Sequence, residues 1–452
     1  MEPAERGLSA HRPRIVVCGG GLAGVAAACE AAGAGAEVTL VERRPFLGGK
    51  AYSFATSTGR ELDNGQHVFL GCCPAYLALL RLLGTSDRVV LQRSMRVPVR
   101  DRSGVRGALW AAPLPAPAHL GPAFTAYPHL TTREKAAAGQ ALAALRLLGE
   151  RGRRRIDDIT FLEWLEAHGQ GRRAVEALWD LIVLPTCNDR SERVSAGLAA
   201  FVFKEGLLRR RAASAVGYAR VGLTSLVDPA TRTFLAARGG RVMDGSAVAE
   251  AGPGGVWLTD GRHLPADGVV LALPPERTRE VASAALPADP GLGSSPIVNV
   301  HAWFDRPVMD DDFEAIIDSP AQWVFNRTAI TGGGPGQHLA VSISGAREEV
   351  EVPREELAER IVAELAHLYP RAAGARLEEV AVVKEPHATF AAAPGQAARR
   401  PGPHTPLERV ALAGAWTATG WPATMEGAVR SGMRAARVAL EHDVQPSLSR
   451  FP

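Results

Sequence analysis

The chain has 452 residues, of which 46% are hydrophobic and 22% are charged. This is the composition of a globular protein long enough to form two or more lobes. The formal net charge of +3 is too small to indicate a nucleic-acid partner, and the basic residues do not alternate with aromatic ones.

The five cysteines, Cys18, Cys29, Cys72, Cys73 and Cys187, contain no Cys-x-x-Cys pair. Neither a zinc ribbon nor a thioredoxin-like site is therefore expected, and we expect no bound metal. The sequence has no apolar run long enough for a signal peptide or a membrane-spanning helix. We therefore expect a cytoplasmic protein.

A first β-α-β unit is predicted over residues 14–42. A short strand at 15–18 is followed by the spacing G-x-G-x-x-G, a helix at 22–32 and a second strand at 38–41 that ends on an acid. In such a unit the helix N-terminus faces a pyrophosphate, and the acid accepts hydrogen bonds from a ribose. An ordinary strand–helix turn is the alternative for the glycines alone. We expect a dinucleotide to contact Gly19, Gly21, Leu22, Ala23, Gly24, Glu42 and Arg43.

The next stretch, "RRPFLGGKAYS", distinguishes FAD from NAD. The doublet Gly48-Gly49 allows the chain to turn tightly beside the pyrophosphate, and Lys50 can offset the charge of that group. Coupled to the preceding unit, the doublet indicates FAD.

A polar cluster follows in "RELDNGQHVFLGCCPAY", residues 60–76. Asp63, Asn64, Gln66 and His67 offer many hydrogen-bonding groups in a short segment. A solvated loop is the alternative interpretation for any one of them.

Residues 105–180 are predicted to be rich in helix, as in "REKAAAGQALAALRLLGERGRRR" and "FLEWLEAHG". Leu142, Leu145, Leu147 and Leu148 recur at helical spacing. Two basic clusters follow: Arg151, Arg153, Arg154 and Arg155, then Arg209, Arg210 and Arg211. Solvated surface arginines are the simpler interpretation. Peripheral contact with anionic lipid on the inner face of the cytoplasmic membrane is the other.

From residue 217 the pattern is again typical of a nucleotide-binding domain. Short β-rich runs lie around Val242, Val248, Val256 and residues 269–273. Strand-like pieces at 296–304, 322–327 and 339–344, an amphipathic helix at 354–369 and a strand–turn–helix at 410–432 follow. This order predicts an FAD-binding domain built from 13–75, 217–290 and 375–440, a substrate domain built from 76–216 and 291–374, and flexible ends at 1–12 and 441–452.

The pairing of "GGGLAG…VE…GGKAYS" with a late "LAG…PATMEGAVRSG" resembles the superfamily of FAD-dependent amine oxidases and carotene desaturases. Within it, the chain is similar to the hydroxysqualene dehydroxylases. Four stretches carry that similarity: "DNGQHVFLG" at 63–71, "LWDLIVLPTCNDRSERVSA" at 178–196, "QWVFNR" at 322–327 and "WTATGWPATMEGAVRSG" at 416–432. The resemblance implies an α/β fold, with a Rossmann-like FAD-binding domain of the amine oxidase type and an inserted mixed α+β substrate domain.

The resemblance also implies how FAD is held. The first motif would hold the AMP end, Val248 would meet the adenine, and the backbone around Thr424, Met425 and Glu426 would face the pyrimidine side of the flavin. Further contacts are implied at Gly65, Gln66, His67, Gly414, Ala415 and Ala428. Two departures stand out. Phe46 and Lys50 replace arginines that usually flank the glycine doublet, and Ala415 replaces an aspartate that bonds the ribityl or phosphate part of FAD.

The implied reaction is reductive removal of the allylic hydroxyl of hydroxysqualene to give squalene, a step of hopanoid and triterpenoid biosynthesis. Asp63, Gln66 and His67 are the candidates for the general acid, although His67 can equally be a structural histidine beside the flavin. Trp303, Phe304, Trp323, Phe325 and Trp421 can line an apolar tunnel for the long-chain isoprenoid, and ordinary core packing is the alternative.

Two other functions remain open from the sequence. A polyene or carotenoid desaturase would use the same flavin with hydride flowing in the opposite direction. A lipid carrier that has lost FAD is favoured only by Ala415. The chain has no second Rossmann motif for NAD(P)H, so the sequence does not indicate the electron donor.

Overall fold

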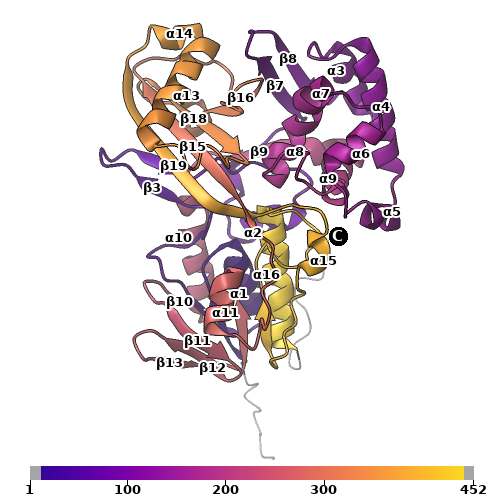
Figure 1. The fold of residues 1–452 in the computed structure, drawn as a ribbon. Helices are drawn as coiled ribbons and strands as arrows, with labels where there is room; N and C mark the ends of the chain where they lie inside the picture. The colour runs from indigo at the N-terminus through magenta and orange to yellow at the C-terminus, as the bar shows by residue number, and fades with distance from the viewer. Residues whose placement is uncertain (1–11, 442–452) are drawn as a thin grey trace, which may run out of the picture.

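The structure, a computed structural model, describes residues 12–441 (Figure 1). The ends that we expected to be flexible, 1–12 and 441–452, lie outside these residues apart from Arg12 and Glu441. Among residues 12–441, every helix falls short of the length and apolar character that a membrane span needs.

A five-stranded parallel sheet forms the lower half of the molecule in Figure 1, in the order β10-β2-β1-β14-β20. Its strands are β1 (Arg14–Cys18), β2 (Glu37–Val41), β10 (Arg241–Met243), β14 (Gly268–Leu271) and β20 (Val410–Leu412). The predicted first unit is confirmed, because helix α1 (Leu22–Gly33) connects β1 to β2. The sheet therefore brings together three parts of the chain that are far apart in the sequence.

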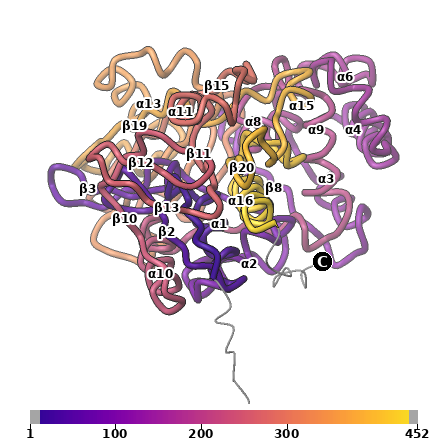
Figure 2. The backbone as a smooth tube through the Cα atoms, turned by 90° about the horizontal axis from the view of Figure 1, so that it is seen from below, coloured from indigo at the N-terminus to yellow at the C-terminus, as the bar shows by residue number. Residues whose placement is uncertain are grey.

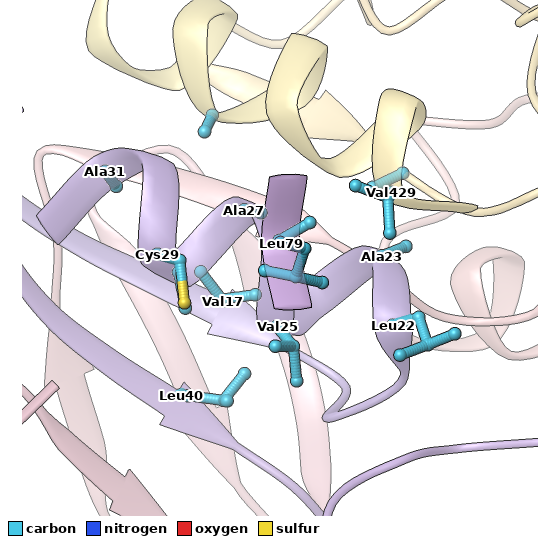
Figure 3. Close-up of a cluster of buried hydrophobic side chains, with 14 of the residues drawn as sticks. Val17, Leu22, Ala23, Val25, Ala27, Cys29, Ala31, Leu40, Leu79 and Val429 are labelled. Atoms are coloured by element: carbon cyan, nitrogen blue, oxygen red, sulfur yellow. The ribbon is translucent and has the colours of Figure 1, made fainter. Parts of the chain in front are cut away.

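Helix α16 (Met425–Leu440) packs directly on α1, and Figure 2 shows the two helices side by side. The contact is close because Gly432 faces α1: a Cβ on Gly432 would lie 2.0 Å from the carbonyl oxygen of Ala23. Val429 of α16 and Ala23 belong to one buried cluster (Figure 3). Small residues on both helices thus hold the C-terminal helix against the first β-α-β unit.

Helix α2 (Pro74–Leu82) also belongs to this half. Its buried residues Tyr76, Leu79 and Leu80 lie in the same core cluster as α1 and α16. We had placed the start of the substrate domain at residue 76. The packing of α2 moves that boundary beyond the helix, because the apolar face of α2 is covered by α16.

A seven-stranded sheet runs from the left of the upper half of Figure 1 to its centre, in the order β19-β15-β18-β17-β16-β7-β8. Its strands are β7 (Arg96–Asp101), β8 (Arg106–Trp110), β15 (Ser294–Phe304), β16 (Phe313–Ile317), β17 (Trp323–Asn326), β18 (Gln337–Ser344) and β19 (Leu377–Phe390). We had assigned 375–390 to the FAD-binding domain. Instead, β19 is antiparallel to β15 and pairs with it along nearly its whole length, so residues 377–390 belong to the seven-stranded sheet.

Strand β15 divides its side chains between two environments. Val298, Val300 and Ala302 pack in one core cluster with helix α13 (Arg354–Leu368), whose bounds agree with the predicted amphipathic helix. Because successive side chains alternate across a strand, Asn299, His301 and Trp303 lie on the opposite face. That face meets the segment containing the predicted polar cluster, since Asn299 donates a hydrogen bond to the backbone of Asn64.

A helical lobe occupies the upper right of Figure 1. Its helices are α3 (Gly121–Ala126), α4 (Thr132–Leu147), α5 (Glu150–Arg155), α6 (Phe161–Ala167), α7 (Arg172–Ala174), α8 (Asp180–Cys187) and α9 (Ala196–Phe203). Of the leucines at helical spacing, Leu145 is fully buried but Leu147 is 83% exposed. Leu142 and Leu148 pack, partly buried, against the same core as Leu145, so of these four leucines Leu147 alone points away from the apolar face.

Three small sheets and several short helices complete the fold. The sheets are the hairpin β3 (Ser53–Ala55) with β4 (Glu61–Asp63); β5 (Phe69–Leu70), β9 (Val216–Ala219) and β6 (Val89–Leu91); and β11 (Val248–Gly252), β12 (Gly255–Leu258) and β13 (His263–Pro265). The helices are α10 (Leu223–Ala236), α11 (Pro275–Val281), α12 (Arg327–Thr331), α14 (Pro370–Ala373) and α15 (Gln396–Arg399).

Candidate active site

The turn from β1 to α1 is shaped to approach a phosphate. Gly19 has a φ of +103°, and a Cβ on Gly24 would lie 1.8 Å from the carbonyl oxygen of Gly19. Gly21 caps α1 without a side-chain hydrogen bond, and the first turn of α1 carries no acidic residue. The N–H groups of that turn and the positive end of the helix dipole are therefore available for an anion.

Glu42 follows β2 beside this turn and is buried. Its carboxylate accepts hydrogen bonds from the N–H of Gly20 at 2.7 Å and from the N–H of Arg44 at 2.9 Å. These bonds fix the carboxylate next to the glycine turn and leave it further lone pairs, so that it can still accept from a ribose hydroxyl. Arg43, in contrast, is exposed.

The glycine doublet packs against the first turn. The N–H of Gly48 donates to the carbonyl of Gly20 at 2.9 Å, and a Cβ on Gly49 would lie 2.6 Å from Cα of Gly21. Lys50, which we expected to offset the pyrophosphate charge, instead donates to the carbonyls of His387 and Ala388 at the end of β19.

Arg44, which no motif in the sequence indicates, is a cation beside the glycine doublet. Its guanidinium donates to the carbonyl of Gly49 at 3.0 Å and lies 4.7 Å from the ring centroid of Tyr52. Arg43 was the predicted contact, and Arg44 is the next residue. The two differ in the direction of their side chains, because Arg44 points to the glycine doublet and Arg43 is exposed.

The 63–67 segment contains one fully engaged carboxylate. Asp63 accepts from Oγ of Ser53 at 2.7 Å and from the N–H of Leu223 at 3.0 Å, and it forms an ion pair with Arg327 at 3.2 Å. Both partners of the pair are buried. Protein donors therefore engage both oxygens of Asp63, which argues against a role as proton donor to a substrate.

His67 and Gln66 are less engaged. Nδ1 of His67 lies 3.0 Å from the carbonyl oxygen of Gly65; because a carbonyl only accepts, Nδ1 carries a proton. Nε2 of Gln66 is buried and has no hydrogen-bond partner among the described residues. Both side chains thus keep a polar atom available for a ligand.

Asn299 is a further site residue that the sequence analysis did not identify. It is fully buried on β15; its Nδ2 donates to the carbonyl of Asn64 at 3.1 Å, and its Oδ1 has no partner among the described residues. A Cβ on Gly65 would lie 3.2 Å from Nδ2 of Asn299, so a side chain at 65 would require Asn299 to shift by a few tenths of an ångström. The only signal in the sequence was an asparagine within a run of apolar strand residues.

Two histidines lie beside Asn299 on the same face of the sheet. Nδ1 of His301 lies 3.0 Å from Nε2 of His338, and the His338 ring stacks on Trp303 with centroids 4.2 Å apart. Burial, with a smaller contribution from the positive charge of Arg327, lowers the pKa of His301 to about 3. Burial also lowers the pKa of His338, so this pair is neutral at pH 7.

At the other end of the site, the loop after β20 leads into α16. Thr424 is the N-cap of α16, and its side-chain oxygen accepts a hydrogen bond from the N–H of Gly427 at 3.2 Å. Met425 is the first residue of the helix. The side chain of Glu426 points elsewhere: it caps α2 by accepting from the N–H of Tyr76 at 2.8 Å, and it pairs with Arg430 at 2.6 Å. Only the backbone of Glu426 remains for the cofactor.

Val248, which the resemblance places at the adenine, is the first residue of β11, and its backbone carbonyl accepts a hydrogen bond from the side chain of Arg277.

The aromatic residues predicted to line a tunnel lie in four separate places. Trp303 packs with Leu62 and Val383. Trp323 and Phe325 stack with centroids 6.2 Å apart against the core of the helical lobe. Phe304 lies in the core on α13, and Trp421 contacts Phe201 of α9 with centroids 5.1 Å apart.

Comparison with known proteins identifies the family. The model of the flavin containing amine oxidoreductases matches residues 22–440. The chain belongs to this family. It is an FAD-dependent oxidoreductase, and this excludes a carrier that has lost FAD.

Three relatives are similar to the chain over nearly the full length of both proteins. The chain is 33% identical to hydroxysqualene dehydroxylase of Rhodopseudomonas palustris and 31% identical to that of Sinorhizobium fredii, in each case over 94% of this chain and 98% of the relative. It is 26% identical to 15-cis-phytoene desaturase of Synechococcus elongatus, over 97% of this chain and 98% of the relative.

Solved structures confirm the fold class. An oxidoreductase from Methanosarcina mazei has a TM-score of 0.72 at 18% identity, covering 93% of this chain and 99% of its own. Cyclohexylamine oxidase from Brevibacterium oxydans has a TM-score of 0.71 at 18% identity, covering 95% and 99%.

The described residues fit FAD. The uncapped start of α1 and the close approach of Gly49 to Gly21 suit a pyrophosphate, and Glu42 suits a ribose. The unpartnered Nε2 of Gln66 and Oδ1 of Asn299 are a buried donor and a buried acceptor, as a flavin ring edge with its own donors and acceptors requires.

Proposed function

We propose that this enzyme removes the hydroxyl of hydroxysqualene reductively and releases squalene and water. The observation that carries the proposal is the similarity to two hydroxysqualene dehydroxylases along almost the full length of both chains. The carotene desaturases that are similar over comparable lengths are 25–26% identical.

The reaction needs a proton and a hydride. The proton goes to the departing hydroxyl, which leaves as water, and the hydride replaces it at the allylic carbon. Bound FAD in its reduced form supplies the hydride. The protein has to bind the hydroxyl, donate the proton and keep bulk water away from the cationic carbon.

His67 is the proton donor that this geometry favours, and Gln66 is a neighbouring ligand for the hydroxyl. Since Nδ1 of His67 is directed at the carbonyl of Gly65, Nε2 is the atom that can face the substrate, and it donates only when the ring carries both protons. Asp63 holds Arg327 and the local backbone in place instead.

We also propose that the helical lobe docks on an anionic membrane that holds the substrate. Leu147 is exposed at the end of α4, directly before the arginines of α5. The turn Lys204–Leu208 that precedes the second basic cluster lies against the same end of α4, because Lys204 donates to the carbonyl of Leu148 at 2.7 Å. An apolar side chain among arginines suits an anionic lipid surface.

The reaction is tested anaerobically. The enzyme is reduced with dithionite and separated from excess reductant, hydroxysqualene is added, and the flavin absorbance is followed while squalene is assayed. Return of the oxidised spectrum with squalene formed in equal amount is the expected result. A flavin that stays reduced overturns the dehydroxylase, and oxidised enzyme that bleaches on addition of a carotenoid precursor supports a desaturase.

Membrane docking is tested separately with vesicles of phosphatidylglycerol and phosphatidylcholine. Leu147→Glu should reduce co-sedimentation with the anionic vesicles, and a neutral vesicle should bind neither protein. Equal sedimentation of the Leu147→Glu variant and wild type would contradict this part of the proposal.

A further inference from the structure

Arg400 is a buried arginine with an unusual set of partners. It follows α15 and is buried beneath the loop that connects β20 to α16. Its guanidinium donates to the carbonyls of Trp421 at 2.7 Å, Ala415 at 2.8 Å and Trp416 at 3.3 Å. It also donates to the carbonyl of Thr417 and, at 3.1 Å, to Oγ1 of Thr419.

Every acceptor lies in residues 415–421, here called the flavin loop. Among the described residues no carboxylate forms an ion pair with Arg400, although the negative charge of Asp157 acts on it from a distance. The ring centroid of Phe390 lies 4.7 Å from Cζ of Arg400. Burial lowers the pKa of Arg400 to about 10, which leaves the guanidinium charged at neutral pH. A buried charge satisfied by uncharged oxygens needs all of them in place, so the loop and the arginine fix each other.

The flavin loop lies where a cofactor binds in a parallel sheet. Ligands of such sheets bind at the carboxyl ends of the strands, and β20 is separated from β1 by a single strand, β14. The loop begins at the carboxyl end of β20 and finishes at the N-terminus of α16. The glycine turn after β1 lies at the same edge of the sheet.

The carbonyl contacts also orient the N–H groups of the loop. In a planar trans peptide the C=O and the N–H point in opposite directions. Because the carbonyl of Ala415 points at Arg400, the N–H of Trp416 points away from it. The N–H groups of Ala415 and Trp416 have no acceptor among the residues that the structure describes, whereas those of Thr417 and Ala418 donate to Gly414 and Pro401.

We propose that Arg400 is a positioning residue for FAD, which draws the carbonyl of Ala415 inward and so presents the N–H of Trp416 to the cofactor. Thr417 holds the carbonyl of Gly414 within the same loop, and with it the N–H of Ala415. Position 415 carries no side-chain acceptor in this chain, so the backbone donors are the contact that the loop offers there. A planar fork of five N–H donors is required to gather this many acceptors, and an ammonium has neither the reach nor the geometry. The inference rests on FAD binding and is independent of the substrate.

Arg400→Lys in the full-length holoenzyme tests the proposal, because it keeps the charge and removes the fork. FAD released on dilution is measured by its fluorescence, and hydrogen exchange of peptides covering 414–424 is measured on the same samples. The matched control is Arg399→Gln, because Arg399 is the adjacent arginine and is exposed, and its guanidinium donates to the carbonyl of Gly291.

The expected result is a rise in the FAD dissociation constant of about tenfold or more for Arg400→Lys, with faster exchange confined to the flavin loop. The Arg399→Gln control should match wild type. An Arg400→Lys protein that folds, retains wild-type FAD affinity and shows wild-type exchange in 414–424 would overturn the proposal. If faster exchange spreads over the parallel sheet while FAD affinity is unchanged, Arg400 is only a structural residue and the proposal fails as well.

Discussion

The pair formed by Asp63 and Arg327 decides whether Asp63 is a structural residue or a proton donor. Asp63→Asn keeps an oxygen that can accept from Ser53 and from the N–H of Leu223, but it removes the charge that balances Arg327. Since both side chains are buried, the loss leaves an uncompensated guanidinium. We expect the free energy of unfolding to fall by about 3 kcal/mol.

The assay is urea unfolding at pH 7.5 with excess FAD in every sample, because bound cofactor contributes to apparent stability. Arg327→Met and the double variant Asp63→Asn with Arg327→Met complete the cycle. If the two residues act mainly on each other, the double variant should lose about 2 kcal/mol less than the sum of the single losses.

A different result would refute this reasoning. If Asp63→Asn unfolds at the same urea concentration as wild type but reoxidises its reduced flavin with hydroxysqualene about 100-fold more slowly, Asp63 is the general acid. His67 would then be the structural residue of the two.

Three further predictions concern the same region. Stability should depend on pH through His301: its pKa is near 3 in the folded protein and about 6.5 when unfolded, so the unfolded chain alone takes up this proton between those values. The contribution of His301 to the free energy of unfolding is complete above pH 6.5, and it falls by about 1.4 kcal/mol for each pH unit below that value. His301→Gln should therefore flatten the plot of urea midpoint against pH. His67→Gln should slow single-turnover reoxidation of the flavin by about 100-fold or more without changing FAD affinity; an unchanged rate would exclude the acid role. Ala415→Asp should tighten FAD binding about tenfold in the fluorescence dilution assay if the resemblance assigns this position correctly, and weaker binding would contradict that assignment.

The parts of the fold that could be predicted from the sequence were those specified locally. The glycine spacing, the small residues of α1 and the acid after β2 lie within one short stretch, and the structure has them as β1, α1 and β2. The pairing of β19 with β15 could not be predicted in this way. Its residues have strand propensity wherever they pair, and only the free edge of a distant strand determines the partner.

The roles of individual side chains in the site were harder to predict for the same reason. Asp63 was a plausible acid until Arg327, which comes from beyond β17, was seen to contact it. Asn299 carries no motif, and its unpartnered Oδ1 is apparent only when the strand is placed against Asn64. Lys50 was expected near a phosphate because of its position in the doublet, yet its side chain reaches β19.

The distribution of charge in the site bears on the choice between the dehydroxylase and the desaturase. Arg327 and Arg400 are each occupied by protein groups, and the buried histidines are neutral. The polar atoms left for ligands include Nε2 of Gln66, Oδ1 of Asn299, Nε2 of His67 and Nε2 of His301, which suit neutral groups rather than an anionic substrate. A polyene hydrocarbon satisfies none of them, whereas an alcohol both donates and accepts. If the flavin occupies all of these atoms, hydroxysqualene and squalene should bind with similar affinity. If the alcohol takes one of them, truncating that side chain should weaken binding of hydroxysqualene and leave binding of squalene unchanged.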